Sequence, residues 1–183
     1  PGGPLDREAD RRMATIYLPE RRVPMLPPDV SARKGSLVAG ESRAALSLLA
    51  RISDSGDILD WEVVPSVIRS RAALSYEEAD GAIDEPTHPW HQMMASLNAI
   101  GELLRSGRER AGAINVERPE MMIGVSESGE VRVRVVSRSS PARRLVTELM
   151  VLCNSLLAEL CRREGVPAAY RSQAVPDLNE VAG

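Results

Sequence analysis

The fold is decided by the apolar stretch AALSLLARI at residues 44–52 and the polar turn DSGD that follows it at residues 54–57. Asp, Ser and Gly favour tight turns, and apolar runs on both sides of such a turn predict a β-hairpin. We expect the second strand of this hairpin over residues 58–74. Because proline cannot donate a backbone hydrogen bond, Pro65 within this strand indicates a sheet edge or a bulge.

A second hairpin is predicted from residues 121–125 and 131–136, which flank a polar turn. Arginines alternate with valines in its second strand and beyond it, at Arg132, Arg134 and Arg138. Successive side chains of a strand point to opposite faces. The pattern therefore predicts a half-buried strand whose outward face is a row of arginines.

Two long helices are predicted, one after each hairpin. Residues 90–110 and residues 141–164 both carry apolar side chains at a spacing near 3.6 residues. Pro141 stands at the first position of the second helix and Gly165 directly after its last turn. Proline and glycine are typical of these two helix ends, so the bounds of this helix are well defined by the sequence.

The remaining predicted elements are shorter. Ser75 is a typical N-cap for a short helix, with Glu77 and Glu78 in its first turn. The other expectations are a helix at residues 5–12, short strands at 14–18 and 166–170, a loop-rich segment at 19–39, a polar loop at 81–89 and a loose tail after Val175.

The order of hairpin, helix, hairpin and helix indicates an α/β (α+β) fold. Long helices would pack on a largely antiparallel or mixed sheet formed from the two hairpins. With 183 residues the chain is long enough for one domain with a sizeable core. We find neither repeats nor an internal boundary, so residues 1–183 are expected to form one unit.

The charge balance gives no general attraction for nucleic acid, because the formal net charge is −3. The basic residues are unusual in kind, since Lys34 is the only lysine and the others are arginines. Arginine offers a planar fork that fits phosphate and stacks on bases. Genome composition can also replace lysine by arginine throughout a protein. A path for RNA would therefore have to be local.

Candidate metal ligands are weak when taken by themselves. His88 and His91 have no third nitrogen or sulfur ligand nearby, whereas a zinc site needs three or four ligands. The clustered acidic residues fall in predicted turns and loops, where turn chemistry or a solvated surface is the better interpretation. These residues are Asp54, Asp57, Asp60, Asp80, Asp84 and Glu85. No metal site is predicted within the chain.

The cysteines and the apolar segments favour a cytoplasmic location. Cys153 and Cys161 lie two turns apart in one predicted helix, too far for a disulfide, which fits a reducing compartment. No apolar run approaches the roughly 20 residues needed to span a bilayer. The polar segment at residues 6–12 has no signal-peptide core.

Short motifs follow one another along nearly the whole chain. They are LDREA (5–9), ATIYLP (14–19), VPMLP (23–27), SL (36–37), GE (40–41), RAALS (43–47), IRSRA (68–72), LSYEE (74–78), GAI (112–114), RPE (118–120), PARRLV (141–146), ELM (148–150) and PAAYRSQ (167–173). In order and spacing they resemble the ribonuclease II/R family, which has an RNB-type catalytic domain. The last motif is most similar to the plastid and cyanobacterial branch of that family.

The resemblance implies a Mg²⁺-dependent 3′→5′ exoribonuclease that degrades single-stranded RNA to nucleoside 5′-monophosphates. In this family aspartates hold the Mg²⁺, which activates water and stabilises charge on the phosphate. Those aspartates would precede residue 1, and a later catalytic arginine would follow Gly183. The chain is therefore expected to be the middle of one RNB-type domain, truncated at both ends. It would supply walls of the RNA channel and be inactive alone.

The resemblance also assigns RNA contacts. Tyr17 and Tyr76 match aromatic positions near the RNA end, and Glu148 matches a glutamate that faces the terminal nucleotide. We expect Tyr17 and Glu148 to border an open groove. Arg43 and Arg171 are candidates for phosphate contact. The alternatives are structural: packing or a helix start for the tyrosines, a boundary position for Glu148, and ion pairs with neighbouring carboxylates for the arginines.

Two positions depart from the family pattern. Val116 stands where many members carry an aromatic residue. Gln173 stands where many carry histidine, and this change agrees with the plastid and cyanobacterial branch. Because the resemblance extends to relatives that have lost the catalytic aspartates and act by binding, a catalytically inactive RNA-binding or scaffold relative of the same fold is an alternative function. A domain without any RNA role is a third, because the net charge is acidic and aromatic residues make up only 3% of the chain.

Overall fold

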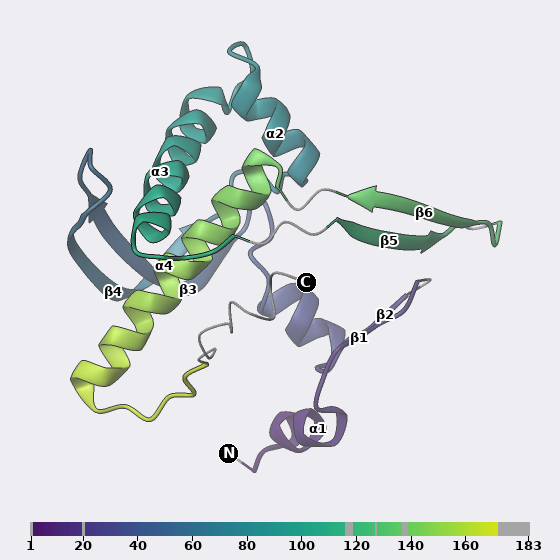
Figure 1. Ribbon diagram of the computed structural model, residues 1–183. Coiled ribbons are helices and arrows are strands. Elements are labelled where there is room, and N and C mark those ends of the chain that lie inside the picture. Colours follow the sequence, from purple (N-terminus) through teal and green to yellow (C-terminus); the bar gives the residue numbers. More distant parts are fainter. Residues whose placement is uncertain (1, 20, 116–118, 127, 137–138, 172–183) are drawn as a thin grey trace, which may run out of the picture.

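The computed structural model describes residues 2–19, 21–115, 119–126, 128–136 and 139–171. Its elements are α1 (Pro4–Arg12), β1 (Ile16–Tyr17), β2 (Arg22–Val23), the π-helix η1 (Asp29–Lys34), β3 (Ser42–Ile52), β4 (Ile58–Arg69), α2 (Tyr76–Asp84), α3 (His91–Arg110), β5 (Glu120–Val125), β6 (Val131–Val136) and α4 (Pro141–Glu164). Helices α2, α3 and α4 pack together, and the β5–β6 and α1–β1–β2 segments project from them (Figure 1). The predictions that concern Val116, Arg138, Gln173 and the tail after Val175 lie outside the described residues.

The predicted fold class is confirmed, with antiparallel hairpins and long packed helices. The described strands form separate two-stranded ribbons, β1–β2, β3–β4 and β5–β6, rather than one continuous sheet. The segment at residues 19–39, predicted as loop, contains β2 and η1. The prediction missed both because each is very short and because prolines interrupt the apolar pattern between them.

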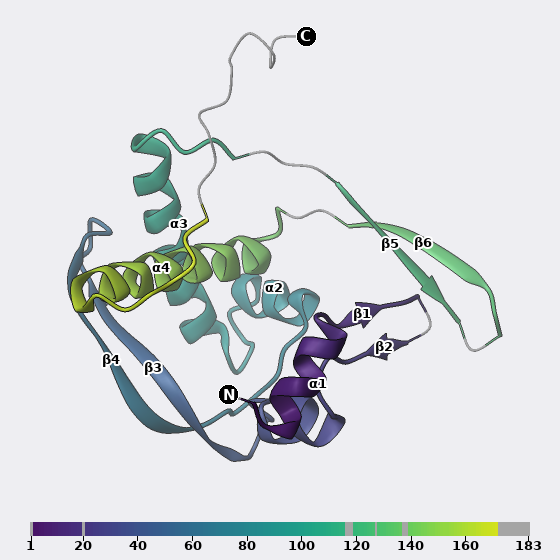
Figure 2. The same ribbon diagram turned by 90° about the horizontal axis from the view of Figure 1, so that it is seen from below.

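Strands β3 and β4 form the hairpin that the sequence predicts, and this long ribbon curves alongside the helices (Figure 2). A bulge lies between Arg51 and Ile52, whereas Pro65 stands in the regular ladder opposite Leu46. Among the described residues this sheet has two strands, so Pro65 lies on an edge strand, as expected.

Strand β4 ends at Arg69, earlier than the predicted end at residue 74. Two hydrogen bonds close the open end of the hairpin there. The Gly40 N–H donates to the Ser70 carbonyl at 2.7 Å, and Arg69 Nε donates to the Gly40 carbonyl at 2.9 Å. Beyond this point no strand of the described chain pairs with residues 70–74, which connect β4 to α2.

Ser75 begins α2 through a complete capping box. Its hydroxyl accepts the Glu78 N–H at 3.2 Å, and the Glu78 carboxylate accepts the Ser75 N–H at 2.7 Å. The helix continues to Asp84, so the prediction of a loop is wrong for residues 81–84. Packing is the reason, because Ala82 is 0% exposed and belongs to the core shared with α3 and α4.

Helices α3 and α4 lie close together at Gly101. A Cβ atom at this position would lie 3.3 Å from Leu145 Cδ1 and 3.4 Å from Leu145 Cα. A carboxylate of α2 adds a polar tie, since Asp80 Oδ1 accepts the Ala142 N–H at 2.8 Å at the N-terminus of α4. The buried apolar core consists of Ala79, Ala82, Met94, Ala142 and Leu145.

The β5–β6 ribbon has the predicted strands, but the prediction that one of its faces is buried is wrong. Val131, Val133 and Val135 are 62%, 59% and 70% exposed. Arg132 and Arg134 stand on the opposite face and are exposed as well. The ribbon projects from the body in both views (Figures 1 and 2), so no described element covers it.

Helix α4 ends at Gly165, whose φ of 65° is the left-handed conformation that glycine adopts readily. The strand predicted at residues 166–170 is absent from the described chain. No described strand lies beside this segment to pair with it. Instead the Tyr170 hydroxyl donates to the Ala158 carbonyl at 3.3 Å, which ties the segment to α4. Cys153 and Cys161 are both free on this helix.

Candidate nucleic-acid interface

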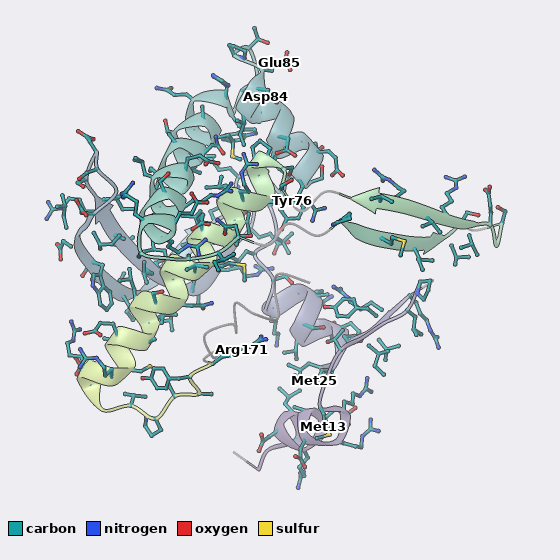
Figure 3. The ribbon with its side chains drawn as sticks, viewed as in Figure 1. Met13, Met25, Tyr76, Asp84, Glu85 and Arg171 are labelled. Atoms are coloured by element: carbon teal, nitrogen blue, oxygen red, sulfur yellow. The ribbon has the colours of Figure 1, made fainter. Side chains whose placement is uncertain are left out.

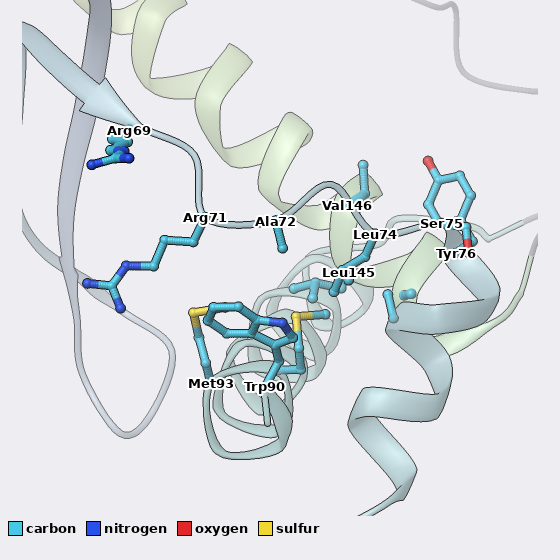
Figure 4. Close-up of a pocket in the computed structure, with 13 residues that line it drawn as sticks. Arg69, Arg71, Ala72, Leu74, Ser75, Tyr76, Trp90, Met93, Leu145 and Val146 are labelled. Atoms are coloured by element: carbon cyan, nitrogen blue, oxygen red, sulfur yellow. The ribbon is translucent and has the colours of Figure 1, made fainter. Parts of the chain in front are cut away.

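A pocket of about 500 Å³ lies between the segment that joins β4 to α2 and the helices α3 and α4. Trp90 and Met93 line its middle, Tyr76 lies at one end, and Arg69 and Arg71 lie at the other (Figure 4). Its remaining lining residues are Ala72, Leu74, Ser75, Ala79, Met94, Ala142, Leu145 and Val146. The pocket therefore combines a mainly apolar wall with cationic and hydroxyl groups at its ends.

The Tyr76 ring at the end of this pocket is held from α4. The guanidinium carbon of Arg143 lies 4.2 Å from the centre of the ring. A cation over an aromatic face stabilises the pair by about 0.5–1 kcal/mol at a partly exposed site. The arginine covers one face of the ring, so a planar group can stack only on the other. Tyr76 is 37% exposed, which leaves room for such contact.

Glu148 lies in the contact between α3 and α4 and is 4% exposed. Its carboxylate accepts two hydrogen bonds from Arg108, from Nε at 2.8 Å and from Nη2 at 2.5 Å. Arg108 is one of the two arginines in the last turn of α3, and its side chain is 32% exposed. The bonds to Glu148 raise the pKa of the Arg108 guanidinium. The geometry is the bidentate fork that makes arginine–carboxylate pairs strong.

A second ion pair joins the same two helices. Arg144 Nε donates to Glu102 at 3.1 Å, and these side chains are 31% and 44% exposed. Arg144 also donates to the Ser139 carbonyl just before α4. The two pairs have opposite polarity across the helix contact, since α3 contributes the acid in one and the arginine in the other.

Tyr17 lies on the β1–β2 ribbon and is 76% exposed. This ribbon projects away from α4 (Figures 1 and 2). The pockets described in this section are lined by neither Tyr17 nor Glu148. That these two residues border one open groove stays a prediction.

Arg43 and Arg171 line other pockets than Tyr76 does. Arg43 pairs with the Glu41 carboxylate and also donates to the Arg33 carbonyl at 3.3 Å. It lines a separate pocket of about 660 Å³. Arg171 lines another pocket, of about 570 Å³, beside the C-terminal half of α4. Figure 3 labels Arg171 on the segment that follows α4 and Tyr76 at the start of α2.

Several of the histidines and acidic residues considered as metal ligands have other partners. His88 Nδ1 accepts the Trp90 N–H at 3.2 Å, and His91 Nδ1 contacts the Ala82 carbonyl at 3.1 Å. Asp57 accepts a hydrogen bond from the Ser55 hydroxyl within its turn. In the described ranges, no group of three or more His, Cys, Asp or Glu side chains could hold a metal ion.

The structure adds two arginines that the sequence analysis did not select, Arg108 and Arg143. Glu148 and Arg108 are 40 residues apart in sequence, so their pairing depends on the packing of α3 against α4. Arginines are common near the C-terminus of a helix because they interact favourably with the helix dipole. Their presence there therefore gives no reason to expect a further role. No signal in the sequence distinguishes Arg108 from Arg105 or Arg110.

Comparison with known proteins identifies the family. The whole chain, residues 1–183, matches the RNB domain. The chain belongs to the RNB domain family. This RNB chain is 31% identical over 182 residues to Ribonuclease R of Thermotoga maritima, covering 96% of the chain and 26% of the relative. It is 30% identical over 183 residues to an uncharacterized ribonuclease of the cyanobacterium Synechocystis, covering 97% and 26%.

These matches confirm the resemblance that the motifs predict. The RNB chain spans about a quarter of the length of these curated relatives. Its fold superimposes on RNase R of Mycoplasma genitalium in complex with ribose-methylated single-stranded RNA, with a TM-score of 0.86 and 22% identity over 100% of this chain and 29% of that one. Yeast Ssd1, a pseudonuclease, has a TM-score of 0.71 and 22% identity over 99% and 22% of the two chains. The likeness to these two structures shows the fold alone.

In the part of the chain that the structure describes, no helix is long and apolar enough to cross a membrane.

Proposed function

We propose that the RNB chain is part of a Mg²⁺-dependent 3′→5′ exoribonuclease that degrades single-stranded RNA to nucleoside 5′-monophosphates. Within that enzyme it would be the middle portion of a single catalytic domain and would supply walls of the RNA path. The observation that carries the proposal is the match to the RNB domain over residues 1–183. The relatives named Ribonuclease R support it.

Tyr76 and its pocket are the proposed contact for an RNA base. The exposed face of the tyrosine ring suits stacking, and the apolar wall beside it suits a planar group. Base stacking on an aromatic side chain contributes about 1–3 kcal/mol per base. Arg69 and Arg71 at the other end of the pocket offer donors for a phosphate.

The other predicted RNA contacts remain proposals. Tyr17 is exposed enough to stack on a base farther along the strand. Arg43 and Arg171 would contact phosphates, and for Arg43 this requires an exchange or sharing of its bond to Glu41. Glu148 is buried, so a direct contact to the terminal nucleotide would need the helices or Arg108 to move.

The described residues do not fit a Mg²⁺ site, because they contain no cluster of carboxylates that could hold the ion. Mg²⁺ would supply activation of water and stabilisation of phosphate charge in the whole enzyme. We place its aspartate ligands upstream of residue 1, and no step of the reaction is assigned to residues of this chain. The cytoplasmic location expected from the sequence stays a prediction.

The alternative function is that of an inactive RNA-binding or scaffold protein. The fold likeness to yeast Ssd1, a pseudonuclease, favours keeping this alternative. The two functions differ in the polypeptide upstream of residue 1, where an aspartate cluster would favour the enzyme. A nuclease assay on the full-length parent protein with Mg²⁺ decides between them, because only the enzyme releases nucleoside monophosphates.

RNA binding by the chain itself tests the part of the proposal that concerns the RNA path. We would titrate a fluorescein-labelled single-stranded oligoribonucleotide with the wild-type chain and measure its anisotropy. Tyr76→Ala should weaken binding by about ten- to a hundredfold, whereas Tyr76→Phe keeps the ring and should bind like the wild type. Leu59→Ala is the control, because Leu59 is an exposed apolar residue of β4 that lines none of the pockets described above. Equal binding by all four proteins would refute the role of Tyr76.

A further inference from the structure

The guanidinium of Arg108 has a second edge that can hold an acceptor. Its Nε–H and one N–H of Nη2 point at the two oxygens of Glu148. A guanidinium carries five N–H donors in one plane, so the edge formed by Nη1 and Nη2 keeps donors of its own. Within the described residues, no side chain or carbonyl accepts a hydrogen bond from Nη1.

Burial shows which partner of this pair a ligand would meet. The Glu148 side chain is 4% exposed, whereas the Arg108 side chain, which covers its carboxylate, is 32% exposed. Both carboxylate oxygens of Glu148 are already engaged by Arg108. A molecule that approaches the contact between α3 and α4 therefore reaches the arginine before it reaches the glutamate.

The described carboxylates near Arg108 have hydrogen-bond partners of their own, and Glu109 in addition raises the pKa of Arg108 through its charge. The nearby carboxylate of Glu109 accepts Arg105 Nε at 2.9 Å and Asn115 Nδ2 at 2.5 Å. The other acid of this helix contact, Glu102, is paired with Arg144. Among the described residues no acceptor occupies the edge formed by Nη1 and Nη2, so this edge can take an acceptor from outside the described part of the chain.

We infer that Arg108 is a phosphate-binding residue of the RNA path and that Glu148 is the positioning residue that holds its guanidinium. This inference rests on the proposed function. Two parallel N–H donors fit two oxygens of a phosphate, and such charge-assisted pairs are among the stronger hydrogen bonds. The buried carboxylate fixes the plane of the guanidinium in advance, so less side-chain freedom is lost when the phosphate binds. Glu148 then acts through Arg108 and need not touch RNA.

The test uses the whole chain and the same labelled oligoribonucleotide. Arg108→Met should weaken binding about ten- to a hundredfold, the value expected for losing charge-assisted hydrogen bonds. It should also reduce the slope of log affinity against log salt by about 0.7, which is one phosphate contact on a single strand. Arg162→Met is the matched control. Arg162 forms the same bidentate pair with Glu159, but both residues lie on α4 away from the α3 contact.

Further variants keep the test informative if Arg108→Met fails to fold. Arg108→Met combined with Glu148→Leu leaves no buried charge without a partner, and it should bind as weakly as the single variant. Arg108→Lys keeps the charge but loses the fork, so its affinity should fall between wild type and methionine. Glu148→Gln should weaken binding while leaving Arg108 in place, because the guanidinium is no longer fixed. Circular dichroism would confirm the fold of each variant.

The outcomes separate the two proposals. Wild-type affinity in folded Arg108 variants would overturn the inference and leave the proposed function standing. Weak binding by Glu148→Gln alone, with normal binding by Arg108→Met, would mean that Glu148 itself contacts RNA, as the sequence predicts. No binding by the wild-type chain would count against the proposed function and against the inference with it.

Discussion

Removal of Arg108 and removal of the Glu148 charge should destabilise the fold by different amounts. Removal of one partner of a buried ion pair costs about 3–5 kcal/mol, because the other charge is left buried without a partner. Arg108→Met leaves Glu148 in that position, at 4% exposure. Since the contact has one side open to water, we expect the lower end of that range, about 3 kcal/mol.

Glu148→Gln should cost less than Arg108→Met. The arginine that remains is 32% exposed and can turn its charge toward water, and glutamine still offers one acceptor oxygen. About 1 kcal/mol is then expected, the ordinary net value of a hydrogen bond. The double variant Arg108→Met/Glu148→Leu should lie near the wild type, because apolar residues of similar size often replace a buried ion pair without loss.

Thermal unfolding followed by circular dichroism at pH 7 is the assay. For a domain of this size, 1 kcal/mol shifts Tm by roughly 2–4 °C. The expected losses are therefore about 6–12 °C for Arg108→Met and about 2–4 °C for Glu148→Gln. Arg162→Met, which breaks an exposed pair within α4, should leave Tm unchanged. A double variant less stable than Arg108→Met, or equal losses from both single variants, would refute this reasoning.

Three further predictions can be checked with the same methods. Gly101→Val should lower Tm by several degrees, because its side chain would collide with Leu145 where α3 packs on α4. Hydrogen bonds from Ser75 lower the pKa of Glu78 below 4.5, so its contribution to stability is present above that pH and lost as the pH falls through the lowered value. Glu78→Ala should accordingly lower Tm at pH 7, and the deficit should shrink in acid. Finally, the wild-type chain with single-stranded RNA and Mg²⁺ should release no nucleoside monophosphates above a blank, and any clear release would contradict the expected position of the metal ligands.

The positions with local chemical signals were predictable from the sequence. Ser75 and Glu78 form a capping box because their spacing lets each side chain reach the other's backbone N–H. Gly165 ends α4 because it adopts a left-handed conformation without a steric penalty. The family resemblance was equally readable, since ordered motifs need no coordinates. Where the prediction failed, at residues 81–84 and 166–170, the outcome depended on whether a partner element was present.

The candidate site was predictable only in part. Tyr76 was selected from its motif, but its position at one end of a pocket and the arginine over its ring come from helices distant in sequence. The motif also indicated Glu148. Its partner, however, depends on which residue of α3 packs beside it, and that residue is Arg108. The sequence shows that residue 108 is an arginine, but it does not show which group the guanidinium contacts.

The amino-acid sequence by itself determined the type and limits of the main elements and the family, because capping, turn formation and motif spacing act over a few residues. Only the tertiary structure decided which charges are buried together. Arg108 and Glu148 meet because Gly101 lets α3 and α4 come close, and the low exposure of that contact turns an ordinary glutamate into an anchor. Burial depends on the whole packed chain, so no local pattern could have specified it.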